Sequence, residues 1–149
     1  MPNLATKGKI LAGEMAITDT SSDAGIGGIV PRVSKVTMTA ATGAGGALAW
    51  ANPTGQRIIV SKIDIDITTG SGTATIDAGV AANATTSNDT LIDGQSTATA
   101  SVINSAVHHG TNGVGAVAVT SSQYITGSIT GTIGSFAGVA YITYFPIAP

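Results

Sequence analysis

The two histidines of this chain are the first residues whose types and spacing suggest chemistry, because imidazole is a common metal ligand. They are adjacent, His108 and His109. Neighbouring residues on a strand point to opposite faces, so one chain seldom offers both rings to one ion. Alternatively, several copies of the chain could each contribute one histidine ring to a metal ion on their symmetry axis. The favoured interpretation is a pair exposed at a turn.

Carboxylates are the second candidate, for Ca²⁺. Five of them occur in the middle of the chain: Asp64, Asp66, Asp77, Asp89 and Asp93. Asp64 and Asp66 share one face of an expected strand, and Asp77 is expected on a partner strand beside it. Ca²⁺ takes about six to eight oxygen ligands, and no EF-hand spacing is present. Solvated carboxylates are therefore favoured over a metal site.

Catalytic patterns are missing. The sequence GQSTA at 94–98 departs from the G-x-S-x-G pattern at its last position, and no helix is expected after it. The glycine clusters at 25–28 and 43–46 lack the spacing and the helix of a phosphate loop. Glu14 is the single glutamate, and no basic run or aromatic cluster is present. We expect a protein that is not an enzyme, has no cofactor and binds no nucleic acid.

Composition points to a β-rich protein that assembles. Of 149 residues, 43% are hydrophobic and only 9% are charged, with a net charge of −2 and no cysteine. A surface so poor in charge is typical of a protein that covers itself by association. All six basic residues precede residue 63, and no charged residue follows Asp93. No apolar run reaches the length of a membrane span, and ILA at 10–12 is too short for a signal peptide. We expect no membrane partner and no Sec export.

Residues 57–69 and 73–80 carry the clearest strand pattern. Ile59, Ile63, Ile65 and Ile67 alternate with polar residues, which places these four isoleucines on one face, against a core. The other face begins apolar and becomes charged, so its first half is expected to be covered. The GSG sequence at 70–72 is a turn signal. The two runs together predict a long antiparallel hairpin.

The rest of the chain predicts further strands at 32–40, up to Trp50, and at 89–93, 97–107, 114–120, 123–132 and 135–147. About eight short strands predict an all-β antiparallel sandwich or jelly roll over residues 31–149. The last strand is apolar on both faces, and one face carries Tyr141 and Phe145. It is either a central strand or one that meets another subunit. We take Tyr141 and Phe145 as candidate contacts with a partner protein or another subunit.

Residues 1–30 have a different character and predict an extended N-terminal arm. An apolar cluster is made of Ile10, Leu11, Met15 and Ile17. A segment rich in serine and glycine follows it. A frayed terminus is the alternative. The cluster favours an arm that lies on a neighbour or on the domain surface, because a solvated tail has no use for it. These four residues are therefore candidate contacts as well.

The segment after residue 51 resembles small structural proteins of tailed bacteriophages. The motifs are NPTG at 52–55, the Ile-rich strand at 58–69, TIDAGVA at 75–81, ATTSNDTLIDG at 84–94, GTNG at 110–113 and GVAYITY at 138–144. The chain departs from the family where a basic residue often follows GTNG, since VGA stands at 114–116. A charge-based contact at that point is therefore not expected here.

The resemblance is to the capsid decoration proteins, also called cement or auxiliary head proteins. It implies a virion structural protein, made in the host cytoplasm, that binds the outer surface of the capsid and stabilises the head. Its partner would be the major capsid protein, and it would act as a homotrimer. The alternative function is a head-fibre or tail-fibre module, or a receptor-binding β module.

Overall fold

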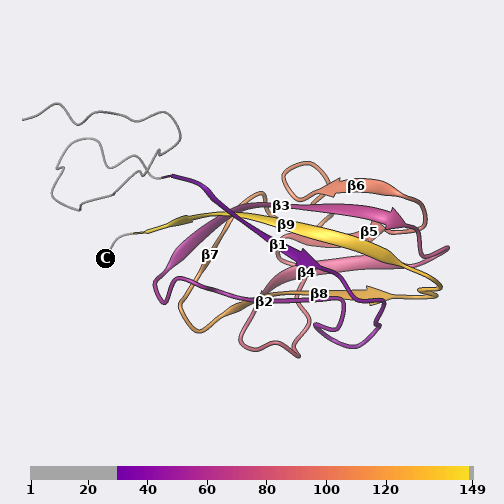
Figure 1. Ribbon diagram of the computed structural model, residues 1–149, viewed down its shortest axis with the longest axis horizontal. Helices are drawn as coiled ribbons and strands as arrows, with labels where there is room; N and C mark the ends of the chain where they lie inside the picture. The colour runs from indigo at the N-terminus through magenta and orange to yellow at the C-terminus, as the bar shows by residue number, and fades with distance from the viewer. Residues whose placement is uncertain (1–29, 148–149) are drawn as a thin grey trace, which may run out of the picture.

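The computed structural model describes residues 30–147, which form two antiparallel β-sheets packed as a sandwich, with no helix (Figure 1). The nine strands are β1 Arg32–Thr37, β2 Leu48–Ala51, β3 Ile58–Thr69, β4 Thr75–Ala81, β5 Ile92–Ser96, β6 Ser101–Asn104, β7 Val117–Val119, β8 Tyr124–Thr130 and β9 Ala137–Pro146. Sheet A has the order β1-β9-β3-β6, with β7 also paired to β3, and sheet B has the order β2-β8-β4-β5. The predicted all-β sandwich is confirmed. The predicted arm lies outside the described residues.

The predicted hairpin of β3 and β4 is wrong, because the two strands belong to different sheets. Residues 70–74 carry the chain across the sandwich. Ser71 N donates to Thr97 O over 2.8 Å, and Gly72 N donates to Ala98 O over 3.3 Å. Gly70 passes so close that an added Cβ would lie 2.2 Å from Ala98 O. The turn therefore bonds to the segment between β5 and β6, and β3 takes β9 as its main partner instead.

A β-bulge in β3 corrects the predicted faces of this strand. Val60 pairs with Tyr144 and Lys62 with Thr143, so Ser61 has no partner on β9. The extra residue switches the alternation from one face to the other. Ile58 and Val60 are fully buried before the bulge, and Ile63, Ile65 and Ile67 are buried after it. Ile59 is 40% exposed, so its predicted place on the core face was wrong.

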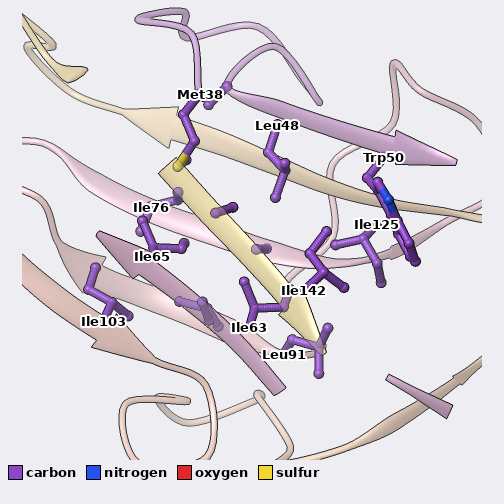
Figure 2. Packing of buried hydrophobic residues seen from close by; sticks show 14 of the residues in the cluster. Met38, Leu48, Trp50, Ile63, Ile65, Ile76, Leu91, Ile103, Ile125 and Ile142 are labelled. Atoms are coloured by element: carbon purple, nitrogen blue, oxygen red, sulfur yellow. The ribbon is translucent and has the colours of Figure 1, made fainter. Parts of the chain in front are cut away.

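The core between the sheets is built from isoleucine and a few larger side chains (Figure 2). Ile63, Ile65 and Ile142 come from sheet A and meet Ile76 and Ile125 of sheet B. At one end, the ring centroids of Trp50 and Tyr144 are 5.3 Å apart and the rings are tilted by 53°. Burial of β-branched side chains on both inner faces is the main stabilising contribution expected for such a sandwich.

The turn after β2 is organised by the buried side chain of Asn52. Its Nδ2 donates to Gln56 O over 2.7 Å, to Thr120 O over 3.0 Å and, more weakly, to Val119 O over 3.4 Å. Its Oδ1 accepts from Thr54 N over 3.0 Å. One amide therefore joins the 52–56 turn to the end of β7, and both its nitrogen and its oxygen are used.

We expect Asn52→Asp to lower the free energy of unfolding by about 2–3 kcal/mol, because a carboxylate would face carbonyl oxygens that have lost their donor. The matched control is Asn83→Asp. Asn83 uses only Oδ1, which accepts from Thr85 and Thr86, so a carboxylate serves there equally well. Urea denaturation of both variants measures the difference. Equal stability losses would show that the Asn52 amide nitrogen contributes nothing.

Candidate interaction face

The middle of the outer face of sheet B is covered by another part of the chain, whereas Ala49 and Ala51 of β2, on the same face, are exposed. Thr126 is fully buried and Ser128 is 5% exposed, although both point away from the core. Residues 83–90 cover them. Thr126 Oγ1 donates to Thr86 O over 2.8 Å, Ser87 Oγ lies 2.6 Å from Ser128 Oγ, and Val80 N donates to Thr90 Oγ1 over 3.0 Å. This cover is polar and bonded along its length.

Two glycines allow the cover to lie close to sheet B. A Cβ added at Gly79 would be 2.5 Å from both Asn88 Oδ1 and Thr90 Oγ1. A Cβ added at Gly45 would be 2.1 Å from Ala84 O, and Gly45 N donates to Ser128 Oγ over 2.9 Å. Sheet B therefore presents its cover to a partner over this region, and not its own strands.

The outer face of sheet A, meaning the outward side chains of β1, β9, β3, β6 and β7, is different. Three aliphatic side chains on it are largely exposed: Val33 at 61%, Ile59 at 40% and Val102 at 59%. Half-buried Val139, Tyr141 and Phe145 lie between them on β9. Phe145 is opposite Ile59, which is opposite Ala118, so β9, β3 and β7 share an apolar row.

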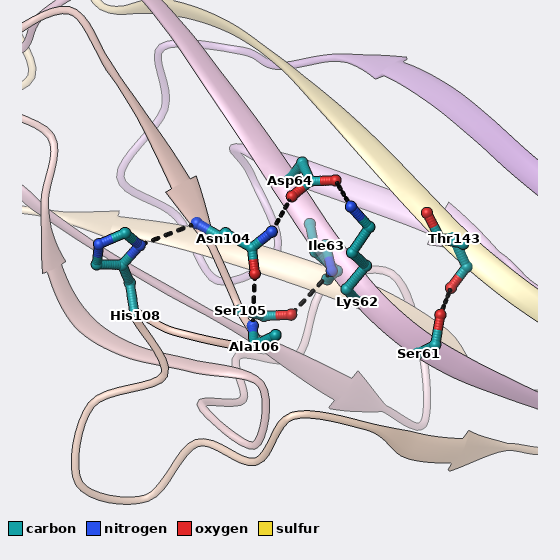
Figure 3. A network of polar contacts seen from close by, with 9 residues as sticks. All are labelled: Ser61, Lys62, Ile63, Asp64, Asn104, Ser105, Ala106, His108 and Thr143. Carbon is teal, nitrogen blue, oxygen red and sulfur yellow. Dashed lines mark hydrogen bonds and ion pairs between the residues drawn. The ribbon is translucent and has the colours of Figure 1, made fainter.

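Balanced charges cross the middle of this face. Tyr141 stands between Lys35 of β1 and Asp64 of β3. Lys62 Nζ lies 2.7 Å from Asp64 Oδ2, and the Asn104 amide donates to Asp64 Oδ1 (Figure 3). These groups are partly exposed, so the ion pair adds little stability. It fixes a polar stripe of balanced charge beside the apolar row, which suits a protein partner better than a polyanion.

The structure brings together two of the predicted contact residues. Tyr141 and Phe145 both lie on the outer face of sheet A, since Phe136, Ala140, Ile142 and Tyr144 turn to the core. The other four, Ile10, Leu11, Met15 and Ile17, lie outside the described residues. Sequence reasoning missed Val33, Ile59 and Val102. The bulge hid Ile59. Val33 stands alone between polar neighbours and Val102 stands beside Ile103, so neither valine gives a distinct signal.

The aspartates that suggested Ca²⁺ are spread over the fold. Asp64 and Asp66 point outward from sheet A, whereas Asp77 belongs to β4 of sheet B, so its predicted place beside them was wrong. Asp77 Oδ1 accepts from Gly94 N over 2.7 Å, and Asp93 Oδ2 accepts from Asn112 N over 3.0 Å. Within residues 30–147, no group of three or more potential ligands is placed to hold a metal.

The adjacent histidines bond within their own turn. His108 Nδ1 accepts from Asn104 N over 3.2 Å, and His109 Nδ1 lies 3.0 Å from Gly110 O. The Nδ1 atom of each ring is therefore engaged by a backbone group. His108 is exposed and His109 is half-buried.

The described part of the chain has no helix long and apolar enough to span a membrane.

Comparison with known proteins returns no relative. No protein-family model, no curated protein and no solved structure matches this chain.

Proposed function

We propose that this chain is a virion structural protein that binds the outer surface of a phage capsid and stabilises the head without catalysing a reaction. The observation that carries the proposal is the unequal cover of the two sheets. Residues 83–90 cover the middle of the outer face of sheet B, while the outer face of sheet A leaves Val33, Ile59 and Val102 exposed around Tyr141 and Phe145. An exposed apolar row beside a polar stripe is typical of a protein-binding surface.

A capsid lattice is a partner that matches such a face. It is a broad protein surface, and it repeats, so many weak contacts add together across the shell. Binding to the assembled lattice and not to its free subunits stabilises the lattice by mass action. The partner in this proposal is the major capsid protein, and the protein acts as a homotrimer, as the resemblance implies.

Both described ends of the chain leave sheet A beside the apolar row. Arg32, the first residue of β1, pairs with Tyr144, and Pro146 ends β9 next to Phe145 (Figure 1). Segment 1–30 is therefore attached where Ile59 and Phe145 lie. In the proposed function the arm and the outer face of sheet A form one continuous surface that binds the capsid.

Location on virions tests the function directly. The full chain is mixed with assembled capsids of the candidate phage, and sedimentation and cryo-microscopy follow. We expect density on the outside of the shell and a higher temperature of capsid disruption. Binding to host cells without binding to capsids would instead support the receptor-binding alternative.

Deletion of residues 1–30 is expected to weaken capsid binding by about tenfold or more, since the Ile10, Leu11, Met15 and Ile17 contacts are lost. Co-sedimentation with a dilution series measures the affinity. A thermal melt checks that the sandwich remains folded, because the core lies within the described residues. Unchanged affinity would remove the arm from the proposal and leave the outer face of sheet A.

A further inference from the structure

Residues 109–113 form a turn between β6 and β7 that is tied to the segment leading into β5. Asp93 N donates to His109 O over 3.0 Å, and Val114 N donates to Thr90 O over 2.9 Å. The side chain of Asn112 adds a third tie, because its Nδ2 donates to Asp89 Oδ2 over 3.2 Å. Its backbone N donates to Asp93 Oδ2 over 3.0 Å. Asn112 thus binds both carboxylates of this segment.

Asn112 is also the one asparagine in the chain that is followed by glycine. Glycine has no side chain to hinder its nitrogen, so the Gly113 N can attack the Asn112 Cγ. A new C–N bond closes a five-membered succinimide, the bond from Cγ to Nδ2 breaks, and ammonia leaves with the proton from Gly113 N. Water then opens the ring at either carbonyl and yields aspartate or isoaspartate.

A second site in the same region offers a contrast in how the glycine nitrogen is bonded. Asp93 is followed by Gly94, a pair with the same freedom of approach, but Gly94 N donates to Asp77 Oδ1 over 2.7 Å. That nitrogen is held by its acceptor. The structure gives Gly113 N no hydrogen bond to any residue in 30–147. Asn112 is exposed and Gly113 is buried, so water can reach the ring from the Asn112 side.

We propose that Asn112 is a site of spontaneous deamidation, and that its conversion releases the 109–113 turn from residues 89–93. The product carboxylate can no longer donate to Asp89, and it stands between two like charges, Asp89 and Asp93. Isoaspartate also lengthens the backbone before Gly113. Gly113 is closely packed, since a Cβ added there would lie 2.1 Å from His109 O. The inference is independent of capsid binding.

The test is ageing of the purified full chain in mildly alkaline buffer. Intact-mass spectrometry should show a gain of about 1 Da, and fragmentation of a chymotryptic peptide should place it at Asn112, with isoaspartate detected by enzymatic methylation. Trypsin is unsuitable, because no Lys or Arg follows residue 62. In Asn112→Gln the gain should disappear, since glutamine cannot close the five-membered ring. A gain at the same rate in Asn112→Gln, or none in the wild type, would overturn the proposal.

The consequence is tested separately with Asn112→Asp, which is the direct product. We expect its Tm to fall by about 2–4 °C, with faster hydrogen exchange at the backbone N–H of Asp93 and Val114. Asn112→Ser, which adds no charge, is the control and should exchange more slowly than Asn112→Asp. An unchanged Tm with unchanged exchange in Asn112→Asp would show that the turn does not depend on the amide.

Discussion

Replacing Ile63 by alanine is expected to lower the free energy of unfolding by about 3–4 kcal/mol, whereas the same change at Ile59 should cost less than about 1 kcal/mol. Both are isoleucines of β3, four positions apart. Ile63 is fully buried between the sheets, so alanine leaves a cavity there (Figure 2). Ile59 is 40% exposed on the outer face of sheet A, where solvent fills the space.

Urea denaturation of the two variants measures this difference. The comparison is also a test of the bulge at Ser61, because an unbroken strand would place Ile59 and Ile63 on the same face. Similar losses at both positions would contradict the bulge and return Ile59 to the core. The slope of unfolding free energy against urea concentration should be the same for both variants. An equal slope means that both expose the same surface on unfolding, so their stabilities can be compared directly.

The strands could be predicted because alternation is a local property. Residues 63–67 read as one buried face in the sequence, and Ile63, Ile65 and Ile67 are buried as expected. The bulge could not be predicted, since Ser61 is an ordinary strand residue and its lack of a partner depends on β9, more than 80 positions away. The pairing of β3 failed for the same reason. GSG at 70–72 favours a turn equally well in a hairpin and in a crossing between sheets.

The candidate site was predictable only where a whole strand face departed from the usual pattern. The last strand is apolar on both faces, which favoured either a central strand or one that meets another subunit. It is central in sheet A, between β1 and β3, and Tyr141 and Phe145 lie on its outer face. The cover on sheet B had no such signal. Residues 81–88 are small and polar, which predicts a loop, and those same properties let Thr86 and Ser87 bond to Thr126 and Ser128. A loop that covers a sheet and a loop exposed to solvent can have the same composition, and only the tertiary contacts distinguish them.

Phe145→Asp is expected to weaken capsid binding by about 100-fold, because a carboxylate would be placed unpaired in the apolar row with Ile59 and Ala118. Ala51→Asp is the matched control. Ala51 is an exposed strand residue on the outer side of sheet B, and it should tolerate the charge with its affinity unchanged. Co-sedimentation with capsids measures both, and light scattering records whether the oligomer persists.

The pattern of losses decides which surface meets the partner. Ile59→Asp lies beside Phe145, so it should repeat the loss of binding and show that the row acts as a unit. Loss of the oligomer together with capsid binding would assign the row to contacts between copies, and loss of capsid binding alone would assign it to the shell. Weakened binding in Ala51→Asp with normal binding in Phe145→Asp would move the contact to sheet B. In that case the exposed side chains of sheet A would need a different partner.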